Sequence, residues 1–281
     1  MLFLLPLLLS GFFVRCRAGH GGNYSVGNPA QKTLILYYDY FSNRDETLNS
    51  KLVVDGLEVA FGGNIGNEPM SIPNAKTSLR LSPADYTYDN VFYYLQSYDY
   101  VHVDEMNNEQ TTCAEDCAEV AERIAEAGLG GRIIFFFRYS YSGAGLSTQT
   151  SLLQAGLDGH LRKIYFEVYG GDFIYTSNVD SAYSKLQQWN SAYASALSGS
   201  NLVIAPAIGL RNGDYSDPYL NICNQDLDAL YTIFSDMHQI QLDWKGCAFY
   251  GASETMDVCG YTVPDLVDKC ASLTSWWAYK R

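Results

Sequence analysis

Short apolar runs alternate with segments of helical periodicity along most of this chain. Four runs lie in the first half, at residues 34–41, 56–64, 76–82 and 98–104, and four in the second half, at residues 132–140, 163–171, 201–209 and 246–254. Most of these runs are continuously apolar, which is typical of strands covered on both faces. The pattern therefore predicts eight strands of a buried sheet.

The segments between these runs place apolar residues at helical spacing. Helices are expected at residues 91–96, 113–127, 149–155, 177–197, 227–237 and 264–276. Gly128 is expected to end the helix that starts at Cys113, because glycine favours the left-handed conformation that closes many helices. Since strands alternate with helices, we expect right-handed crossovers and a parallel sheet.

The number of strand–helix units predicts the fold class. Eight units over roughly 250 residues match the size of a closed (β/α)8 TIM-like barrel. We therefore expect a single α/β barrel domain over residues 19–281. An open doubly wound parallel sheet is the alternative, because the third unit is poorly defined. No glycine-rich phosphate loop follows the first strand, so no nucleotide site is indicated and no cofactor is expected.

The first residues are typical of a secretory signal peptide. Residues 2–14 are apolar, but this stretch is too short to span a bilayer comfortably. The small residues Cys16 and Ala18 fit the −3 and −1 positions of a cleavage site, so residues 1–18 are expected to be removed. We expect a secreted, extracellular protein whose mature chain has no membrane span, with a glycosylation acceptor at Asn23.

The cysteines support this interpretation. Cleavage after Ala18 leaves six of the seven, an even set that suggests up to three disulfide bonds in an oxidising compartment. Cys113 and Cys117 are one helical turn apart, which makes a bond between them awkward, so each is expected to reach a different partner. Cys259 and Cys270 could join the last loop to the last helix. The four histidines show no ligand spacing, and no metal site is expected.

The net charge and the aromatic content indicate which kind of molecule the protein binds. The chain has 31 acidic residues against 18 lysines and arginines, a net charge of −13, and no basic patch. A nucleic-acid partner or an anionic membrane is therefore not expected. The 23 tyrosines and 4 tryptophans are a heavy aromatic load. Such rings suit the apolar faces and polar edges of sugars, so the expected partner is an oligosaccharide or polysaccharide.

Two adjacent acids, Asp104 and Glu105, end the strand at residues 98–104. In a parallel α/β protein the chemistry gathers at the carboxyl ends of the strands. Glu167 stands at another strand end, and two carboxyl groups across a glycosidic bond can protonate the leaving oxygen and attack or activate water. Each acid alone is more simply explained as a loop cap, and only the whole set of strand-end acids favours an enzyme. The further residues expected at the same rim, lining sugar subsites, are Asp39, Arg138, Tyr169 and Glu254.

The segment from Asp99 to Met106 resembles the fourth-strand signature DGxDxDxE of family 18 glycoside hydrolases, which are chitinase-like. Asp99 and Asp104 match the first and third acids of that signature. His102 replaces the second acid, and it is expected to be a core or supporting residue rather than a catalyst. Met106 stands where the catalytic glutamate belongs. Glu105 comes one residue early, where strand alternation would aim it the other way unless the strand has already ended.

This resemblance implies a barrel that acts on, or descends from enzymes that act on, N-acetylhexosamine polymers. Residues 166–169 and 246–251 are similar to the sixth and last strands of the family. The missing glutamate implies altered chemistry or a binding-only protein. A competing tripeptide, Asn67-Glu68-Pro69, resembles the acid/base motif of clan A glycosidases but follows the second strand rather than the fourth. Residues 141–145 do not fit the GxSxG elbow of a serine hydrolase.

The leading hypothesis is a secreted glycoside hydrolase in which Glu105 or Asp104 is the acid and Glu167 the second carboxylate. The alternative is a non-catalytic, chitinase-like protein that binds carbohydrate, as Met106 suggests. A third hypothesis is a secreted structural protein whose barrel is a scaffold.

Overall fold

The computed structural model describes residues 34–38, 50, 52–66, 72–106, 113–137, 143–167, 205–209 and 246–250. The strands are β1 (Leu34–Tyr38), β2 (Glu58–Gly63), β3 (Lys76–Leu81), β4 (Tyr100–Met106), β5 (Ile133–Phe137), β6 (Lys163–Glu167), β7 (Ala205–Gly209) and β8 (Gly246–Tyr250). The helical segments are η1 (Pro83–Asp85), α2 (Tyr88–Tyr94), α3 (Cys117–Ile124), η2 (Ala125–Leu129) and α4 (Gly143–Leu157). Each strand overlaps one of the eight apolar runs.

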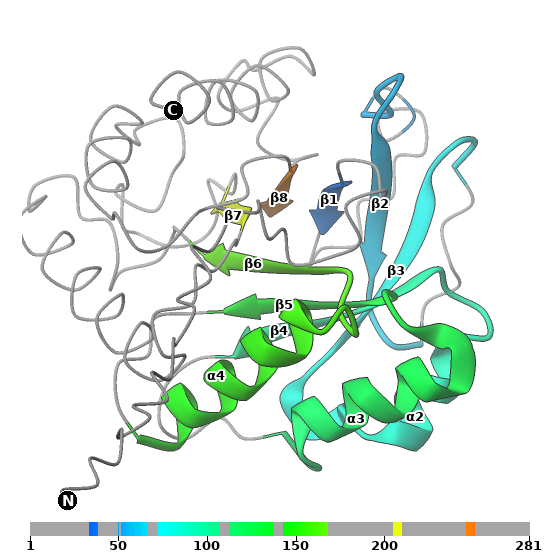
Figure 1. The fold of residues 1–281 in the computed structure, drawn as a ribbon. Helices are drawn as coiled ribbons and strands as arrows, with labels where there is room; N and C mark the ends of the chain where they lie inside the picture. The colour runs from blue at the N-terminus through cyan, green and yellow to red at the C-terminus, as the bar shows by residue number, and fades with distance from the viewer. Residues whose placement is uncertain are drawn as a thin grey trace, which may run out of the picture.

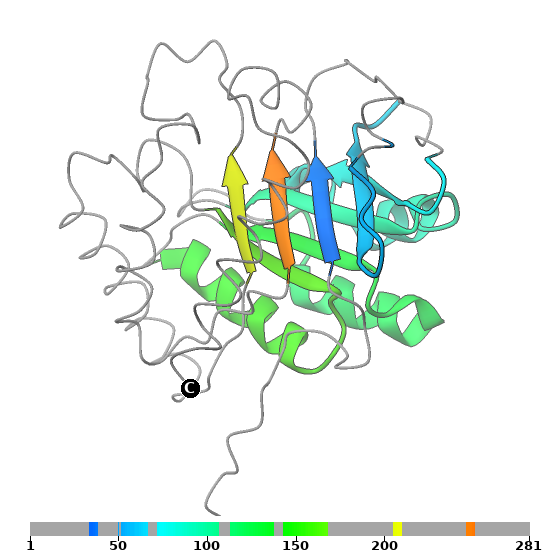
Figure 2. The same cartoon turned by 90° about the horizontal axis from the view of Figure 1, so that it is seen from above.

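All strand pairs are parallel, and the strands pair in the order of the chain. β1 pairs with β2 and also with β8, so that Leu36 lies opposite both Ala60 and Ala248. Figure 2 shows β7, β8, β1 and β2 side by side and pointing the same way. The predicted parallel α/β class is therefore confirmed. This sequential strand order differs from that of a doubly wound sheet, in which the order reverses at a switch point.

Within the described ranges, helices α2, α3 and α4 cover one face of this curled sheet (Figure 1). Figure 1 shows α2, α3 and α4 side by side along the outer face of β3 to β6. Among the described residues, helices follow β3, β4 and β5. The helices expected at residues 177–197, 227–237 and 264–276 lie outside the described residues, as do the expected signal peptide, Asn23, residues 67–69 and the pair Cys259 and Cys270. None of the helices in the described ranges is long and apolar enough to cross a membrane.

Both faces of the sheet are apolar, which explains the continuous apolar runs. One face carries a buried cluster that joins six strands: Leu34, Leu36, Ala60, Tyr100, Ile134, Phe136, Tyr165 and Ala248. On the opposite face, Phe135 lies against Tyr86 of the helix layer, with their ring centroids 5.1 Å apart. Because side chains alternate along a strand, Ile134 and Phe136 point inward while Phe135 points toward the helices.

The helix after β4 corrects two expectations. It begins at Cys117 rather than Cys113, because the side chain of Asp116 caps it by accepting hydrogen bonds from the backbone N–H groups of Ala118 and Glu119, at 3.0 and 3.1 Å. Cys113 therefore lies outside the helix and bonds to Cys117, with their Cα atoms 5.7 Å apart. The expectation of separate partners was wrong because it placed both cysteines on one helix.

A glycine ends the helical segment after α3, and packing extends α4 beyond its expected range. Gly128 has φ +80°, so this glycine adopts the left-handed conformation at the end of the helical segment, as predicted. The helix expected at residues 149–155 instead spans Gly143–Leu157. Its first residues are poor helix formers, but Leu152 and Leu153 are fully buried. Packing of this apolar face supplies the stability that local propensity does not.

Candidate functional site

Four polar side chains gather on the inner face of β3 and β4. Ser78 and Arg80 alternate with Leu79 and Leu81 along β3, and the register places Arg80 beside His102 of β4. Arg80 Nε lies 3.0 Å from Asp104 Oδ2. Ser78 Oγ lies 2.8 Å from His102 Nδ1. We call Ser78, Arg80, His102 and Asp104 the β3–β4 cluster. It approaches the carboxyl end of the sheet, where parallel α/β proteins hold their chemistry.

The two side chains of the ion pair in this cluster differ in their exposure to solvent. The side chain of Asp104 is 2% exposed, whereas that of Arg80 is 25% exposed. The carboxylate is thus enclosed, whereas the Arg80 side chain is partly exposed. A buried carboxylate needs such a partner, because an unpaired buried charge is strongly destabilising. Asp104 therefore serves as an ion-pair acceptor in this arrangement.

His102 is a neutral core residue. Its ring lies edge-on to Phe136, with centroids 5.8 Å apart. Burial lowers the pKa of His102 to about 4; the charge of Asp104 opposes this shift and that of Arg80 adds to it. Ser78, His102 and Asp104 are the residue types of a hydrolytic triad. However, Ser78 is fully buried and Asp104 pairs with Arg80, so the geometry does not favour a serine nucleophile.

The end of β4 contains a β-bulge. Val103 pairs with Phe135 and Met106 pairs with Phe137, so β4 has one more residue than β5 over this stretch. Asp104 and Glu105 together stand opposite Phe136, a residue of the inner face. In an unbroken register Glu105 would instead stand opposite Phe137, one position further along. The bulge thus changes the alternation on which the sequence argument about Glu105 depended.

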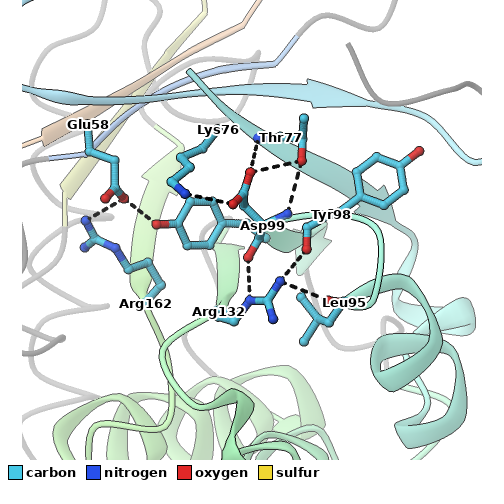
Figure 3. Close-up of polar contacts among 9 residues, drawn as sticks. Glu58, Lys76, Thr77, Leu95, Tyr98, Asp99, Arg132 and Arg162 are labelled. Carbon is cyan, nitrogen blue, oxygen red and sulfur yellow. Dashed lines mark hydrogen bonds and ion pairs between the residues drawn. The ribbon is translucent and has the colours of Figure 1, made fainter. Parts of the chain in front are cut away.

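A second polar group lies at the opposite, amino end of the strands (Figure 3). Arg162, just before β6, places Nη2 3.1 Å from Oε1 of Glu58 at the start of β2. The same carboxylate oxygen accepts a hydrogen bond from the hydroxyl of Tyr100 at the start of β4. Burial and the neighbouring Glu58 raise the pKa of Tyr100 above its ordinary value. These contacts join β2, β4 and β6, and their place indicates a structural role.

Asp99, the first acid of the DGxDxDxE-like segment, also lies at this amino end (Figure 3). Its carboxylate accepts hydrogen bonds from the backbone N–H of Thr77 and from Lys76 Nζ, both at 2.9 Å. Burial alone would raise the pKa of Asp99, but the bonds from Thr77 and Lys76 lower it below its ordinary value. Asp99 therefore ties β3 to β4 and does not join the β3–β4 cluster.

Arg132 joins the end of α2 to the start of β4 (Figure 3). Its guanidinium donates to the carbonyl oxygens of Leu95, Tyr98 and Asp99, at 2.9, 2.5 and 2.8 Å. A cation at the carboxyl end of a helix also interacts favourably with the helix dipole. The segment that leads into β4 is thus fixed by one side chain.

The structure places the expected site residues as follows. Asp104 is part of the β3–β4 cluster. Glu105 lies in the β4 bulge and Glu167 is the last residue of β6, so both backbones stand at the carboxyl end of the sheet. The subsite residues expected at Asp39, Arg138, Tyr169 and Glu254 lie outside the described residues.

Sequence reasoning missed Arg80 and Ser78. The signal that could have revealed them is the alternation within residues 76–81, where these polar residues flank Leu79. Among the residues that the structure describes, no group of three histidine, cysteine or acidic side chains could hold a metal ion.

No family model matches the chain, and no curated protein matches it in sequence. Among solved structures, a GH18 chitinase from Pseudoalteromonas aurantia is similar with a TM-score of 0.47 and 10% identity, over 85% of this chain and 100% of that one. An orotidine 5'-monophosphate decarboxylase from Methanocaldococcus jannaschii has a TM-score of 0.42 and 10% identity, over 88% and 99%. A phosphoribosyl anthranilate isomerase from Thermococcus kodakaraensis has a TM-score of 0.39 and 10% identity, over 85% and 97%. These enzymes differ in activity, and the likeness assigns none of those activities to this chain.

Proposed function

We propose that the chain is a secreted glycoside hydrolase with a complete (β/α)8 barrel and a site at the carboxyl ends of β4 and β6. The observation that carries this proposal is the β4 bulge, which sets Asp104 and Glu105 opposite the single inner-face residue Phe136. Secretion is supported by the apolar residues 2–14 and by the bond between Cys113 and Cys117, because disulfides persist in oxidising compartments.

The bulge and the ion pair support different proposed roles for the two adjacent acids. Arg80 engages Asp104, so Asp104 is the positioned partner in this proposal. Glu105 is then the group that protonates the leaving oxygen of the glycosidic bond. In this proposal Glu105 shares the inner face with Asp104, because the bulge sets both residues opposite Phe136.

Glu167 is the proposed second carboxylate, which attacks the anomeric carbon or activates water. It ends β6, and β5 lies between β6 and β4. Two carboxyl groups on nearby strand ends suit a bond that is cleaved between them. Asp39, Arg138, Tyr169 and Glu254 remain the proposed subsite residues, and the substrate class is an oligosaccharide or polysaccharide.

The test is hydrolysis of a panel of N-acetylhexosamine and glucose polymers by the secreted full chain. Glu105→Gln and Glu167→Gln are each expected to lower turnover by about 10²- to 10⁴-fold, the usual contribution of an acid or base. Glu122→Gln is the matched control, because Glu122 is an exposed acid on α3. Unchanged hydrolysis in the Glu105 and Glu167 variants would contradict the assignment.

A non-catalytic carbohydrate-binding protein is the second candidate. It is favoured by Met106 at the position of the catalytic glutamate in the DGxDxDxE signature. This candidate predicts that the wild-type chain binds glycans on the panel and releases no product from any of them. Binding with turnover that depends on Glu105 would exclude it.

A further inference from the structure

Helix α2 carries four aromatic residues in seven, and part of that aromatic surface faces solvent. We call Tyr88, Phe92, Tyr93 and Tyr94 the α2 aromatic surface. Tyr93 is 70% exposed and Phe92 is 39% exposed, whereas Val91 of the same helix is fully buried. The buried side of α2 already provides its packing, so the exposed rings are not needed for the core. Large exposed aromatic side chains that gather in one place commonly mark a binding surface.

The rings of this surface are held in place by their neighbours. Tyr88 and Phe92 stack with centroids 5.8 Å apart and planes at 22°. The guanidinium of Arg123 on α3 lies 4.1 Å from the centroid of the Tyr88 ring, and Glu115 fixes that guanidinium at 3.4 Å. Tyr93 and Tyr94 meet edge to face at 5.2 Å. Tyr88 is covered by Phe92 and Arg123, so it supports the surface, and a ligand would stack on the exposed Phe92 and Tyr93. Binding to rings that are already held in place costs less side-chain entropy than binding to mobile side chains.

The charges around this surface argue against polyanions. Its neighbouring cation, Arg123, is already engaged by Glu115 and Tyr88, and Asp89 adds an exposed acid. With a net charge of −13, the chain also repels nucleic acids and anionic membranes. These charges do not favour a polyanion, and the uncharged rings and tyrosine hydroxyls of the surface suit a neutral, polyhydroxylated molecule.

The size of the surface argues against a second protein chain. Seven helical residues extend about 10 Å, and a stable protein interface needs about 800 Å² on each partner. A sugar ring, in contrast, is no wider than the aromatic ring on which it stacks. The exposed polar side chains of Asp89 and Gln96 and the tyrosine hydroxyls offer hydrogen bonds to sugar hydroxyls beside the apolar rings.

We propose that the α2 aromatic surface is a second carbohydrate-binding site, which holds a neutral polysaccharide by ring stacking. The ligand class rests on the proposed function. The site is separate from the β3–β4 cluster, because α2 lies on the outer face of the sheet (Figure 1) and the cluster lies on the inner face. In this proposal a polysaccharide held on α2 stays near the protein, while another part of the same polysaccharide can reach the carboxyl end of the sheet.

The test is depletion of the secreted full chain from solution by insoluble chitin and cellulose. The double variant Phe92→Ala and Tyr93→Ala is expected to weaken adsorption by about 5- to 150-fold, because two aromatic contacts of about 0.5–1.5 kcal/mol each are lost. Both side chains are exposed, so the fold should persist. Ile65→Ala is the matched control, since Ile65 is an exposed apolar residue, 48% accessible, on the turn after β2.

Two further measurements separate this site from the proposed hydrolysis. The α2 double variant should hydrolyse short soluble oligosaccharides at the wild-type rate, and Glu105→Gln should adsorb like the wild type. Adsorption without hydrolysis by the wild type would refute the hydrolase and leave the α2 site supported. The α2 proposal is wrong if the wild type adsorbs to neither polymer, if the double variant adsorbs normally, or if Ile65→Ala loses as much. It is also wrong if the wild type is a dimer that the double variant converts to monomers.

Discussion

Arg80 on β3 and Asp104 on β4 form a buried ion pair that joins neighbouring strands beside the proposed acid Glu105. Arg80 Nε lies 3.0 Å from Asp104 Oδ2, and the carboxylate side is almost fully enclosed. The pair therefore fixes the first residue of the β4 bulge. It holds the end of β4 against β3, and it gives the buried carboxylate of Asp104 the cationic partner that burial requires.

Removing the cation alone should be costly. Arg80→Gln leaves Asp104 buried without its ion-pair partner, and we expect the free energy of unfolding to fall by about 3 kcal/mol. The double variant Arg80→Gln and Asp104→Asn should recover part of this loss, because no buried charge remains. Urea unfolding of the two single variants and the double variant gives the coupling energy.

Arg123→Gln is the control for this cycle. Arg123 and Glu115 form an exposed ion pair at 3.4 Å, and such pairs contribute at most about 1 kcal/mol. Equal losses for the Arg80 and Arg123 variants would show that burial of Asp104 does not govern the energetics of the cluster.

The buried His102 should make stability depend on pH. Burial lowers its pKa from 6.5 to about 4, so the unfolded chain binds a proton more readily than the folded chain. The stabilisation is fully present above pH 6.5 and is lost as the pH falls toward 4, up to about 3 kcal/mol for a shift of this size. His102→Gln should remove this component.

The measurement is the free energy of unfolding at pH 7 and pH 4 for the wild type and His102→Gln. Acidic groups titrate in both proteins, so the difference between them isolates His102. The wild type should lose more stability on acidification than the variant. The same loss in both would mean that His102 is not held neutral by its surroundings.

Arg132 should stabilise the junction between α2 and β4 through geometry rather than charge alone. Its guanidinium reaches three carbonyl oxygens, those of Leu95, Tyr98 and Asp99. Arg132→Lys keeps the charge but removes the planar group that spans them, and we expect a loss of about 2 kcal/mol. Hydrogen exchange of the α2 amides should speed up in this variant, while β5 should exchange as before. Unchanged exchange in α2 would rule out this role.

The strands could be predicted because most of them are short runs of mostly apolar residues in the sequence. Ile133 to Phe137 are five buried residues in a row, which only a strand covered on both faces explains. The start of α3 was not predicted correctly, since the cap at Asp116 competes with an equally plausible start at Cys113. That single error also led to the wrong expectation about the bond between Cys113 and Cys117.

The site itself depends on contacts that single-sequence reasoning does not reach. Arg80 looks like an ordinary surface residue in a short polar strand, and only its register beside β4 brings it to Asp104. The bulge depends on the pairing of β4 with β5, whose residues lie about thirty positions later. Alternation along an ideal strand therefore does not describe the backbone register at Glu105, whereas the choice of the β4 end as the place of interest needed only the α/β pattern.

A swap of residues 105 and 106 tests whether the strand register at the bulge or the position in the sequence motif determines which residue is the acid. If the signature position decided the chemistry, moving the acid to residue 106 in the double variant Glu105→Met and Met106→Glu should preserve or improve hydrolysis. The observed register pairs Met106 with Phe137, which shares a face of β5 with Phe135, and Phe135 lies against the helix layer. An acid at residue 106 would therefore stand beside the face that packs on the helices. We expect this swap to lower activity by about 10²-fold or more. Glu105→Asp, which keeps an acid in the bulge, should retain measurable turnover on the same substrate. Activity in the swapped variant would show that the bulge does not determine which residue at the end of β4 carries the proton.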